Sequence, residues 1–328
     1  MTTPQQIVSH ASSPPRADTV CYLCGGPLTA YTNQLRHGPG IALYCAACDL
    51  GMLQDQGWAD LKTYYDQDYR KRHGPTLNQP SSYQEIFDAY VPYQGSRIEC
   101  LKPWLHPRAR LLEVGCCTGH FLHEVKSLVG EVVGVDYDAR AARFASDVCR
   151  CRTFGGPLEE AGLEPASFDL VCTFQTMEHV PDPIRFATLL KRYLKPGGTI
   201  CVEVPSLHDP LLSVFRNPGY RTFHFHEAHL FYFSPASLRA VMERAGFRGE
   251  VRGRQDYNVL NHLHWIMSNG PQSTCREGLG PPRLPIADDV EPALRAELEA
   301  WIEQVDRQYK TLMAKHGRTE NVIFLGTR

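Results

Sequence analysis

The sequence has no excess of charge of either sign. Its 34 lysine and arginine residues stand against 36 aspartate and glutamate residues, so the formal net charge is −2. Proteins that bind nucleic acid through its phosphates are usually basic, and this balance therefore predicts no nucleic-acid partner. No apolar run approaches the roughly 20 residues that a membrane-spanning helix needs, so we expect no membrane segment.

The N-terminus has no recognisable targeting signal. Residues 1–18 lack the basic and then apolar pattern of a secretory signal peptide, and they are rich in Ser, Pro and Thr. We expect a disordered leader there and a cytoplasmic location. The 12 cysteines of a chain without an export signal indicate reduced thiols or metal ligands, not disulfides.

Four cysteines form two Cys-x-x-Cys pairs, Cys21/Cys24 and Cys45/Cys48, with 20 residues between the pairs. This spacing predicts two short hairpins whose tips bring four thiolates onto one zinc ion. A redox Cys-x-x-Cys is the competing interpretation, but two copies favour the metal. Four thiolates leave no open coordination position, so the predicted zinc is structural. It holds residues 19–55, which are too few to build a core alone.

The stretch from Arg110 to Asp138 reads as strand, glycine turn, helix, strand and acid. Gly115 and Gly119 bracket the turn, and Asp136 ends the second apolar run about twenty residues beyond the first glycine. Glycine lets backbone N–H groups approach a ligand closely, and a carboxylate at a strand tip accepts hydrogen bonds from a ribose diol. The unit therefore predicts a nucleoside-binding crevice. The turn lacks the third glycine of the dinucleotide fingerprint, which disfavours a nicotinamide enzyme.

This stretch resembles motif I of the class I S-adenosylmethionine (SAM) methyltransferases. Glu113, Gly115 and Gly119 match the motif, and Cys117 stands at its usual middle glycine. Residues 108–206 are similar to the family in the order and spacing of its further motifs, including Phe-Asp-Leu-Val, Glu-His-Val followed by Asp-Pro, and Lys-Pro-Gly-Gly. The resemblance implies an α/β fold with a seven-stranded Rossmann-like sheet, whose final strand is antiparallel, and SAM as the cofactor.

The resemblance also implies a place for each half of SAM. Asp136 is expected on the ribose, the glycine turn under the carboxypropyl group, and Gln175 beside the methionine half, with Glu178 and His179 as the next candidates there. Leu158 stands where the family often has an acid on the adenine, so it supplies only an apolar contact. The expected cofactor-binding residues are Glu113, Gly115, Cys116, Gly119, Phe121, Asp136, Tyr137, Leu158, Gln175 and Tyr69.

A histidine-rich segment resembles the substrate loop of the deoxysugar C-methyltransferases, which also carry a four-cysteine zinc module. Aligned on Tyr232-Phe233-Ser234, the resemblance puts His229 at the position of the base. Histidine suits proton removal near neutral pH. The expected catalytic residues are His229, Glu227, His226, Tyr232 and His179. The spacing of the histidines between positions 224 and 229 also suggests a metal site, but the interleaved Phe pattern disfavours it.

The expected organisation has three parts after the leader. These are a zinc module at 19–55, a helical cap or linker at 56–105, and a methyltransferase domain at 106–328. Substrate loops are expected near 206–234 and 259–288, the second as a loop or lid. The expected function is methyl transfer from SAM to a small polar metabolite such as a sugar. An RNA methyltransferase and a SAM-binding scaffold without activity are the alternatives. The acceptor, the methylated atom and the oligomeric state stay open.

Overall fold

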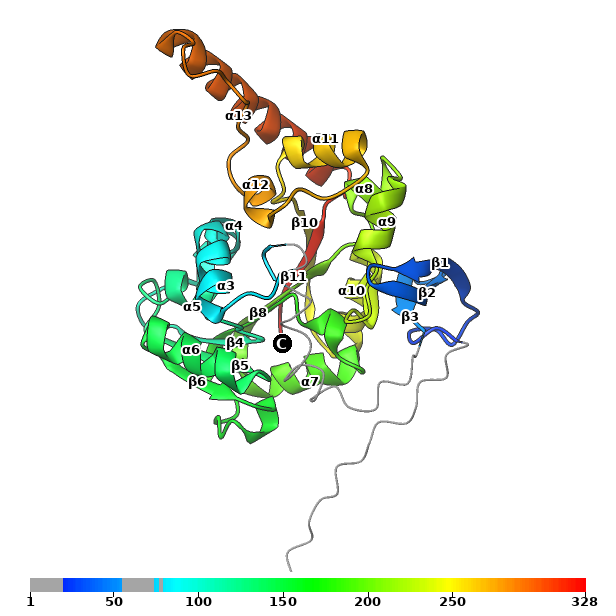
Figure 1. Ribbon diagram of the computed structural model, residues 1–328. Helices are drawn as coiled ribbons and strands as arrows, with labels where there is room; N and C mark the ends of the chain where they lie inside the picture. The colour runs from blue at the N-terminus through cyan, green and yellow to red at the C-terminus, as the bar shows by residue number, and fades with distance from the viewer. Residues whose placement is uncertain (1–19, 55–73, 77–78) are drawn as a thin grey trace, which may run out of the picture.

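The computed structural model describes residues 20–54, 74–76 and 79–328, and Figure 1 shows their arrangement. Its centre is a seven-stranded sheet with the strand order β10-β11-β8-β7-β4-β5-β6. Strand β11 runs antiparallel to β8 and β10, and the strands from β8 to β6 are parallel. The Rossmann-like sheet predicted from the sequence, with its antiparallel final strand, is confirmed. The strands are β4 (Arg110–Val114), β5 (Glu131–Asp136), β6 (Arg152–Gly155), β7 (Phe168–Phe174), β8 (Leu194–Pro205), β10 (Arg248–Arg254) and β11 (Asn321–Thr327).

Helices pack on both faces of this sheet. Side chains alternate between the faces along a strand, so Leu111 and Leu112 of β4 are both fully buried but belong to different core clusters. One cluster includes α7 and α10, and the other includes α4, α5 and α6. The helices of this part are α3 (Tyr83–Tyr90), α4 (Gly95–Leu101), α5 (His120–Val125), α6 (Ala139–Cys149), α7 (Pro183–Tyr193) and α10 (Pro235–Arg244), with short 3-10 turns η1 (Val91–Tyr93), η2 (Lys102–Trp104), η3 (Leu158–Glu160) and η4 (Met177–His179).

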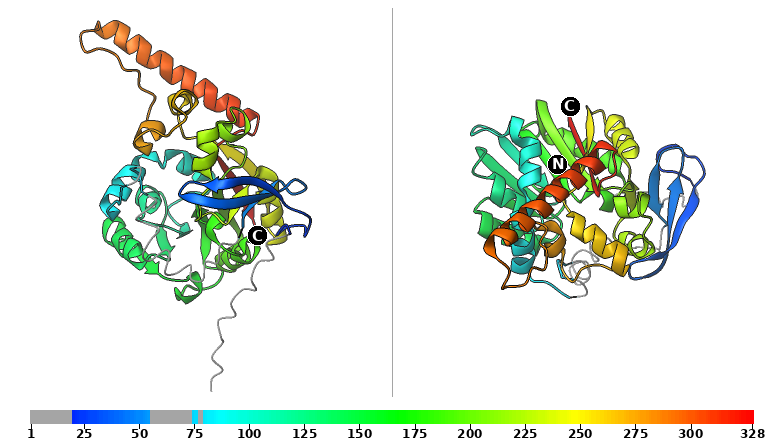
Figure 2. Two further views of the ribbon diagram at one scale, coloured as in Figure 1. Left: turned by 45° about the vertical axis from the view of Figure 1, so that its right-hand side comes forward. Right: turned by 90° about the horizontal axis from the view of Figure 1, so that it is seen from above.

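The N-terminal strands form a second, four-stranded antiparallel sheet whose last strand comes from far along the chain. Strands β1 (Thr29–Leu35), β2 (Gly38–Cys45) and β3 (Leu50–Leu53) pair in order, and β9 (Phe231–Phe233) then pairs with β3. Figure 2 shows this sheet at the side of the main body. The Tyr22 hydroxyl, before β1, joins the N-terminal segment to the start of α7: it donates a hydrogen bond to Asp182 and accepts one from the N–H of Ile184. The N-terminal module and the predicted substrate loop therefore share one sheet.

The two predicted substrate segments contain short helices. Residues 206–234 include α8 (Pro210–Ser213) and α9 (Pro218–His224), and residues 259–288 include α11 (Val259–Ser268) and α12 (Cys275–Leu279). The Gly- and Pro-rich composition predicts a loop or lid in the second segment, and the structure has the helices α11 and α12 there. Asn258 caps α11 by accepting a hydrogen bond from the N–H of Asn261 at 2.9 Å, and Asn269 ends it with a φ of 53°. These terminal asparagines are ordinary helix boundary signals, but composition alone hides them.

The longest helix, α13 (Pro292–Lys315), projects from the body, as Figures 1 and 2 show. Its buried side chains are Ile302, Asp306 and Met313, and the Asp306 carboxylate accepts from the N–H of Val259, at the start of α11, at 2.7 Å. Among the helices that the structure describes, none is both long and apolar enough to span a bilayer.

The contact between α11 and α13 predicts an acid-sensitive step in stability. His262 is buried there and bonds Tyr309, and burial, followed by nearby Lys310, lowers its pKa to about 4. The unfolded chain takes up this proton near pH 6.5, so the stabilising preference for neutral histidine is lost as the pH falls toward 4. Between pH 7 and pH 5 the wild type should lose about 2 kcal/mol more of its free energy of unfolding than His262→Gln. Urea titrations at both pH values measure this difference, and equal losses would contradict it.

Candidate active site

The turn after β4 is tight at its first glycine. Gly115 has a φ of 84°, and a Cβ atom there would lie 2.0 Å from the Oγ1 of Thr176. Gly119 has a φ of 79°, and its Cβ would lie 2.7 Å from the Sγ of Cys149. Cys117 also has a positive φ, 50°, so it adopts the left-handed conformation that favours glycine. The turn therefore brings β4, α6 and the segment after β7 into direct contact.

Substituting Gly115 should lower the free energy of unfolding by more than the left-handed backbone conformation alone explains. Gly162 is a matched control, because it has a φ of 61° but a Cβ there would meet nothing within 4 Å. Gly162→Ala should cost about 1–2 kcal/mol of unfolding free energy from the left-handed backbone. Gly115→Ala should cost about 1–3 kcal/mol more, because the new methyl group clashes with Thr176. Urea denaturation of both variants tests this prediction. Equal losses of unfolding free energy would show that the turn shifts to accommodate the new methyl group at little cost.

Asp136 lies at the end of β5, across the turn. Its carboxylate accepts hydrogen bonds from the N–H groups of Cys117 at 2.7 Å and Asp138 at 2.9 Å. These two bonds fix the orientation of the carboxylate at the tip of β5. Tyr137 follows with 54% of its surface exposed. This half of the site therefore presents an oriented carboxylate and an exposed aromatic ring.

Other predicted cofactor-binding side chains are buried in the core. Cys116 and Phe121 are fully buried, and the Phe121 ring packs edge-on against Phe174 with 4.8 Å between centroids. Leu158 is buried in the cluster with α7 and α10. Burial raises the pKa of the Glu113 carboxyl well above its ordinary value. Contact of these four residues with a cofactor stays a prediction, and Tyr69 lies outside the described residues.

Gln175 lies at the end of β7 on a buried ionic network. Its Nε2 donates to Glu203 at 3.1 Å and to Asn321 at 2.9 Å. Glu203 is fully buried in β8, and it also pairs with the guanidinium groups of Arg97 and Arg254. Sequence reasoning missed this network, although one signal was present: a single acid inside the apolar run Ile-Cys-Val-Glu-Val of β8. The network positions Gln175, whose own φ is 52°.

Two histidines and one glutamate converge just after β7, and we name them the Glu178 cluster: Glu178, His179 and His229. The Glu178 Oε1 atom lies 3.7 Å from the Nε2 of His179 and 3.8 Å from the Nε2 of His229. The rings of the two histidines lie 4.8 Å apart, edge to face. Glu178 has 0% of its surface exposed, and this burial raises its pKa to about 8.

The Glu178 cluster lies beside the glycine turn, since Thr176 is the residue that faces Gly115. Strand β4 has β5 on one side and β7 on the other, and the chain switches direction across the sheet there. Ligands of open α/β sheets bind at such a switch point, outside the carboxyl ends of the strands. The structure thus brings the predicted His179 and His229 together there. Glu178 is the close third member that the predicted set of catalytic residues did not include.

The remaining predicted catalytic residues fix the shape of the loop. The Tyr232 hydroxyl accepts from the N–H of His226 at 2.9 Å and donates to the carbonyl of His226 at 2.9 Å. The Glu227 carboxylate pairs with the His37 ring at 3.0 Å, in the turn between β1 and β2. The His226 ring lies 3.8 Å from that of His229. The N-terminal module therefore contacts the loop that carries His229.

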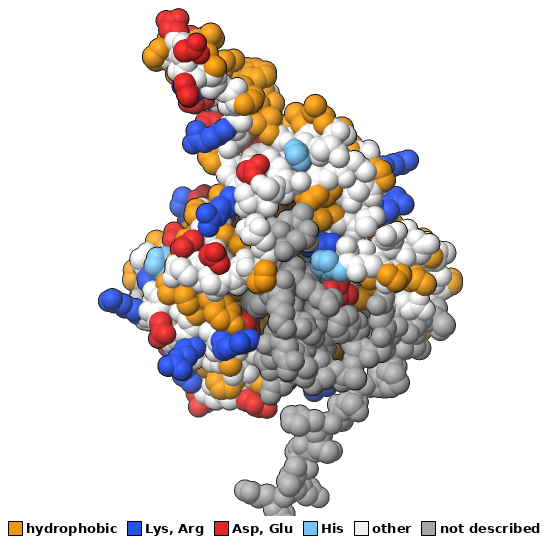
Figure 3. All heavy atoms as spheres, viewed as in Figure 1, with side chains coloured by type: hydrophobic (Ala, Val, Ile, Leu, Met, Phe, Trp, Pro, Cys, Tyr) orange, Lys and Arg blue, Asp and Glu red, His pale blue; other side chains and the backbone are white. Residues whose placement is uncertain are grey.

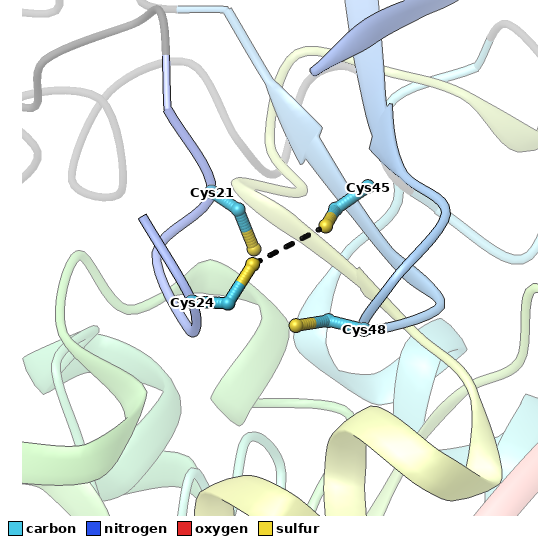
Figure 4. A group of neighbouring side chains, drawn as sticks. All are labelled: Cys21, Cys24, Cys45 and Cys48. Atoms are coloured by element: carbon cyan, nitrogen blue, oxygen red, sulfur yellow. Dashed lines mark hydrogen bonds between the residues drawn. The ribbon is translucent and has the colours of Figure 1, made fainter. Parts of the chain in front are cut away.

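The four predicted metal ligands lie together, as Figure 4 shows. The ligand atoms of Cys21, Cys24, Cys45 and Cys48 all lie within 4.8 Å of one another, and the Sγ atoms of Cys24 and Cys45 are 3.6 Å apart. Tetrahedral zinc with bonds of about 2.3 Å needs sulfur atoms about 3.8 Å apart. The N–H of Gly26 bonds the Cys24 thiol, and this is the first of the contacts that lower its pKa to about 7. The thiols are thus close to the arrangement that zinc requires.

Comparisons with known proteins find similar sequences among the methyltransferases. A protein of Mycolicibacterium smegmatis described as a probable S-adenosylmethionine-dependent methyltransferase is 33% identical over 141 residues, 43% of this chain and 52% of that protein. A ubiquinone biosynthesis O-methyltransferase of Xanthomonas campestris is 33% identical over 100 residues, 29% of this chain and 42% of that protein. The chain thus spans about half the length, or less, of these relatives.

A crystal structure of a SAM-dependent methyltransferase from Archaeoglobus fulgidus aligns with a TM-score of 0.48 and 17% identity, and covers 75% of this chain and 98% of that one. A family model described as a methyltransferase domain matches residues 58–250, more than half of the chain. The chain therefore belongs to the methyltransferase-domain family.

Proposed function

We propose that the chain transfers a methyl group from SAM to a small polar metabolite, and that a sugar or a sugar-containing biosynthetic intermediate is the acceptor. One observation carries the proposal: Asp136 with the Gly115 turn lies on one side of the switch point, and the Glu178 cluster lies on the other. The first group suits a ribose and a carboxypropyl chain, and the second suits a hydroxyl or an acidic C–H.

In this proposal the residues of the chain do two things. SAM supplies a methyl group bonded to a sulfonium sulfur, so the methyl carbon already carries a good leaving group. Asp136 and the turn orient it, since alignment of the reacting atoms is the main requirement. His229 takes up the proton that the acceptor loses, because it is the loop histidine beside Glu178. Tyr232 and Glu227 hold the loop, one through the backbone and the other through His37.

We further propose that Cys21, Cys24, Cys45 and Cys48 hold a structural zinc ion. Four thiolates fill its coordination sphere, so the metal does not take part in the chemistry. Its function is to stabilise β1 to β3, which are anchored to the loop by pairing with β9 and by the N–H of Arg36, which donates to the carbonyl of Phe225 at 2.8 Å.

Asp136→Asn tests the cofactor half of the proposal. The amide keeps the size of the side chain but replaces one acceptor oxygen by a donor and removes the charge, so a ribose diol loses a charge-assisted hydrogen bond. Such a bond is worth about 1.5–3 kcal/mol, and we expect SAM to bind roughly 10- to 100-fold more weakly. Calorimetry with SAM and with its demethylated product measures the affinity. The exposed Asp147→Asn is the control and should bind as the wild type does.

A screen of acceptors tests the substrate class. Purified wild-type protein is incubated with isotope-labelled SAM and either sugar nucleotides or bulk RNA at moderate salt. Figure 3 shows basic and acidic side chains interspersed on one face, which favours the small molecule over RNA. Label in the sugar fraction supports the proposal. Label confined to RNA would overturn the substrate class, and no binding of SAM or its product would overturn the function itself.

A further inference from the structure

The Glu178 carboxylate is the least satisfied polar group of the site. It is fully buried, and neither oxygen has a hydrogen-bond partner in the part of the chain that the structure describes. An unpaired carboxylate is costly to bury, so it is retained only where something balances it. The Nε2 atoms of His179 and His229 lie 3.7 and 3.8 Å from the Glu178 Oε1 atom, beyond hydrogen-bond distance. The space between these three atoms suits a small cation.

The tautomer of His179 also suits a cation. Its Nδ1 lies 2.9 Å from the carbonyl oxygen of Ala228. A carbonyl oxygen only accepts, so Nδ1 carries the hydrogen, and in the neutral ring the Nε2 atom, 3.7 Å from the Oε1 of Glu178, keeps its lone pair. Metal-binding histidines are typically held in this way, with the second nitrogen donating to a backbone carbonyl. The loop that carries His229 is fixed to the same place, because the N–H of Leu230 donates to the carbonyl of Glu178 at 2.8 Å.

We propose that Glu178, His179 and His229 bind one divalent cation. One ligand atom from each residue lies within 4.8 Å of the others. Bonds of about 2.1 Å at right angles need ligand atoms about 3 Å apart, so shifts of less than about 1 Å close the site. Two imidazoles and a carboxylate on one face of a coordination octahedron leave the positions of the opposite face open to other ligands. This donor set suits Mn²⁺, Fe²⁺ or Zn²⁺ better than Mg²⁺ or Ca²⁺, which prefer oxygen alone.

The open positions indicate the acceptor class. This step rests on the proposed function, whereas the cation site itself does not. Two adjacent open positions fit two neighbouring oxygens, as in a vicinal diol or an α-hydroxy ketone. A bound hydroxyl releases its proton to solvent more easily, because the cation stabilises the alkoxide. The alkoxide oxygen then forms a bond to the methyl carbon, the carbon–sulfur bond breaks, and the sulfur keeps its electron pair. Under this inference the methylated atom is oxygen, and His229 is a ligand instead of the proton acceptor.

Mn²⁺ is the probe that separates this site from the cysteines, since it is a hard ion that thiolates bind poorly. We expect the wild-type protein, with its N-terminal thiols intact, to remove one equivalent of Mn²⁺ from the free-ion signal in electron paramagnetic resonance. Glu178→Gln and His229→Gln should bind it at least 10-fold more weakly. His106→Gln changes an exposed histidine outside the cluster and should bind as the wild type does.

A measurement on the unaltered protein guards against misfolded variants. Pulsed resonance of bound Mn²⁺ should show couplings to the nitrogens of two histidines. No bound Mn²⁺, or bound Mn²⁺ without histidine coupling, overturns the inference. A failure of this inference is separated from a failure of the proposed function with chelator-treated protein that keeps the proposed thiol-bound zinc. Calorimetry measures whether this protein binds SAM, and the acceptor assay measures whether it transfers the methyl group. If this protein binds SAM and still methylates its acceptor, the proposed function stands with His229 as the base, and the cation site is refuted as part of the reaction.

Discussion

His229→Ala is expected to lower methyl transfer by about 100- to 10,000-fold, the usual range for losing a positioned acid–base group. The reason is geometric, because the Nε2 of His229 lies 3.8 Å from Glu178 in the loop beside the glycine turn. Binding of SAM should be unchanged, since Asp136 and the turn belong to other strands. Initial rates with a saturating acceptor and calorimetry with SAM measure the two effects separately.

The control for this variant is His106→Ala, which removes an exposed histidine far along the chain from the cluster. Turnover by His229→Ala at the wild-type rate would remove His229 from the reaction, both as base and as metal ligand. Loss of SAM binding together with turnover would mean that the loop supports the cofactor as well.

Cys45→Ser is expected to have the second large effect. Structural zinc contributes an apparent free energy on the order of 10 kcal/mol in small domains, so losing one buried thiolate should release the proposed zinc ion and unfold β1 to β3. Strand β9 would then lose its partner β3, and Glu227 would lose His37. Because His229 is carried by this loop, methyl transfer should fall at least about 100-fold, while SAM still binds at the turn.

Metal analysis of the purified protein, calorimetry with SAM, and rate measurements test this expectation together. Cys100→Ser is the matched control, because it changes a partly buried cysteine on α4. We expect that control to keep one zinc ion and wild-type turnover. A Cys45→Ser protein that retains zinc and full activity would show that the four cysteines have no structural role for the site.

Much of the fold could be predicted from local sequence patterns. The β4-turn-α5-β5 unit was recognisable because an apolar run, a glycine turn and an apolar run follow one another within thirty residues, and such a unit is built from local contacts. The order of the later strands followed from the same pattern and from the family motifs. The helix α11 was missed because its asparagine caps stand in a Gly- and Pro-rich neighbourhood.

The site was less accessible to such reasoning. His179 and His229 are fifty residues apart, and no periodicity relates them to each other or to Glu178. The pairing of Glu203 with Arg97 and Arg254 also joins three distant segments. His229 comes from the loop before β9, Arg97 from α4 and Arg254 from the antiparallel strand β10, so these side chains meet only through long-range packing, which a linear pattern does not record.

The sequence by itself determined the Rossmann-like sheet, the acid at the tip of β5 and the two cysteine pairs, since short-range spacing specifies each of these. Only the tertiary structure decided that the N-terminal sheet ends in β9 and that Glu178 faces two histidines. The physical reason is that strand pairing and burial are long-range: a carboxylate such as Glu178 acquires its environment when the surrounding segments exclude water from it.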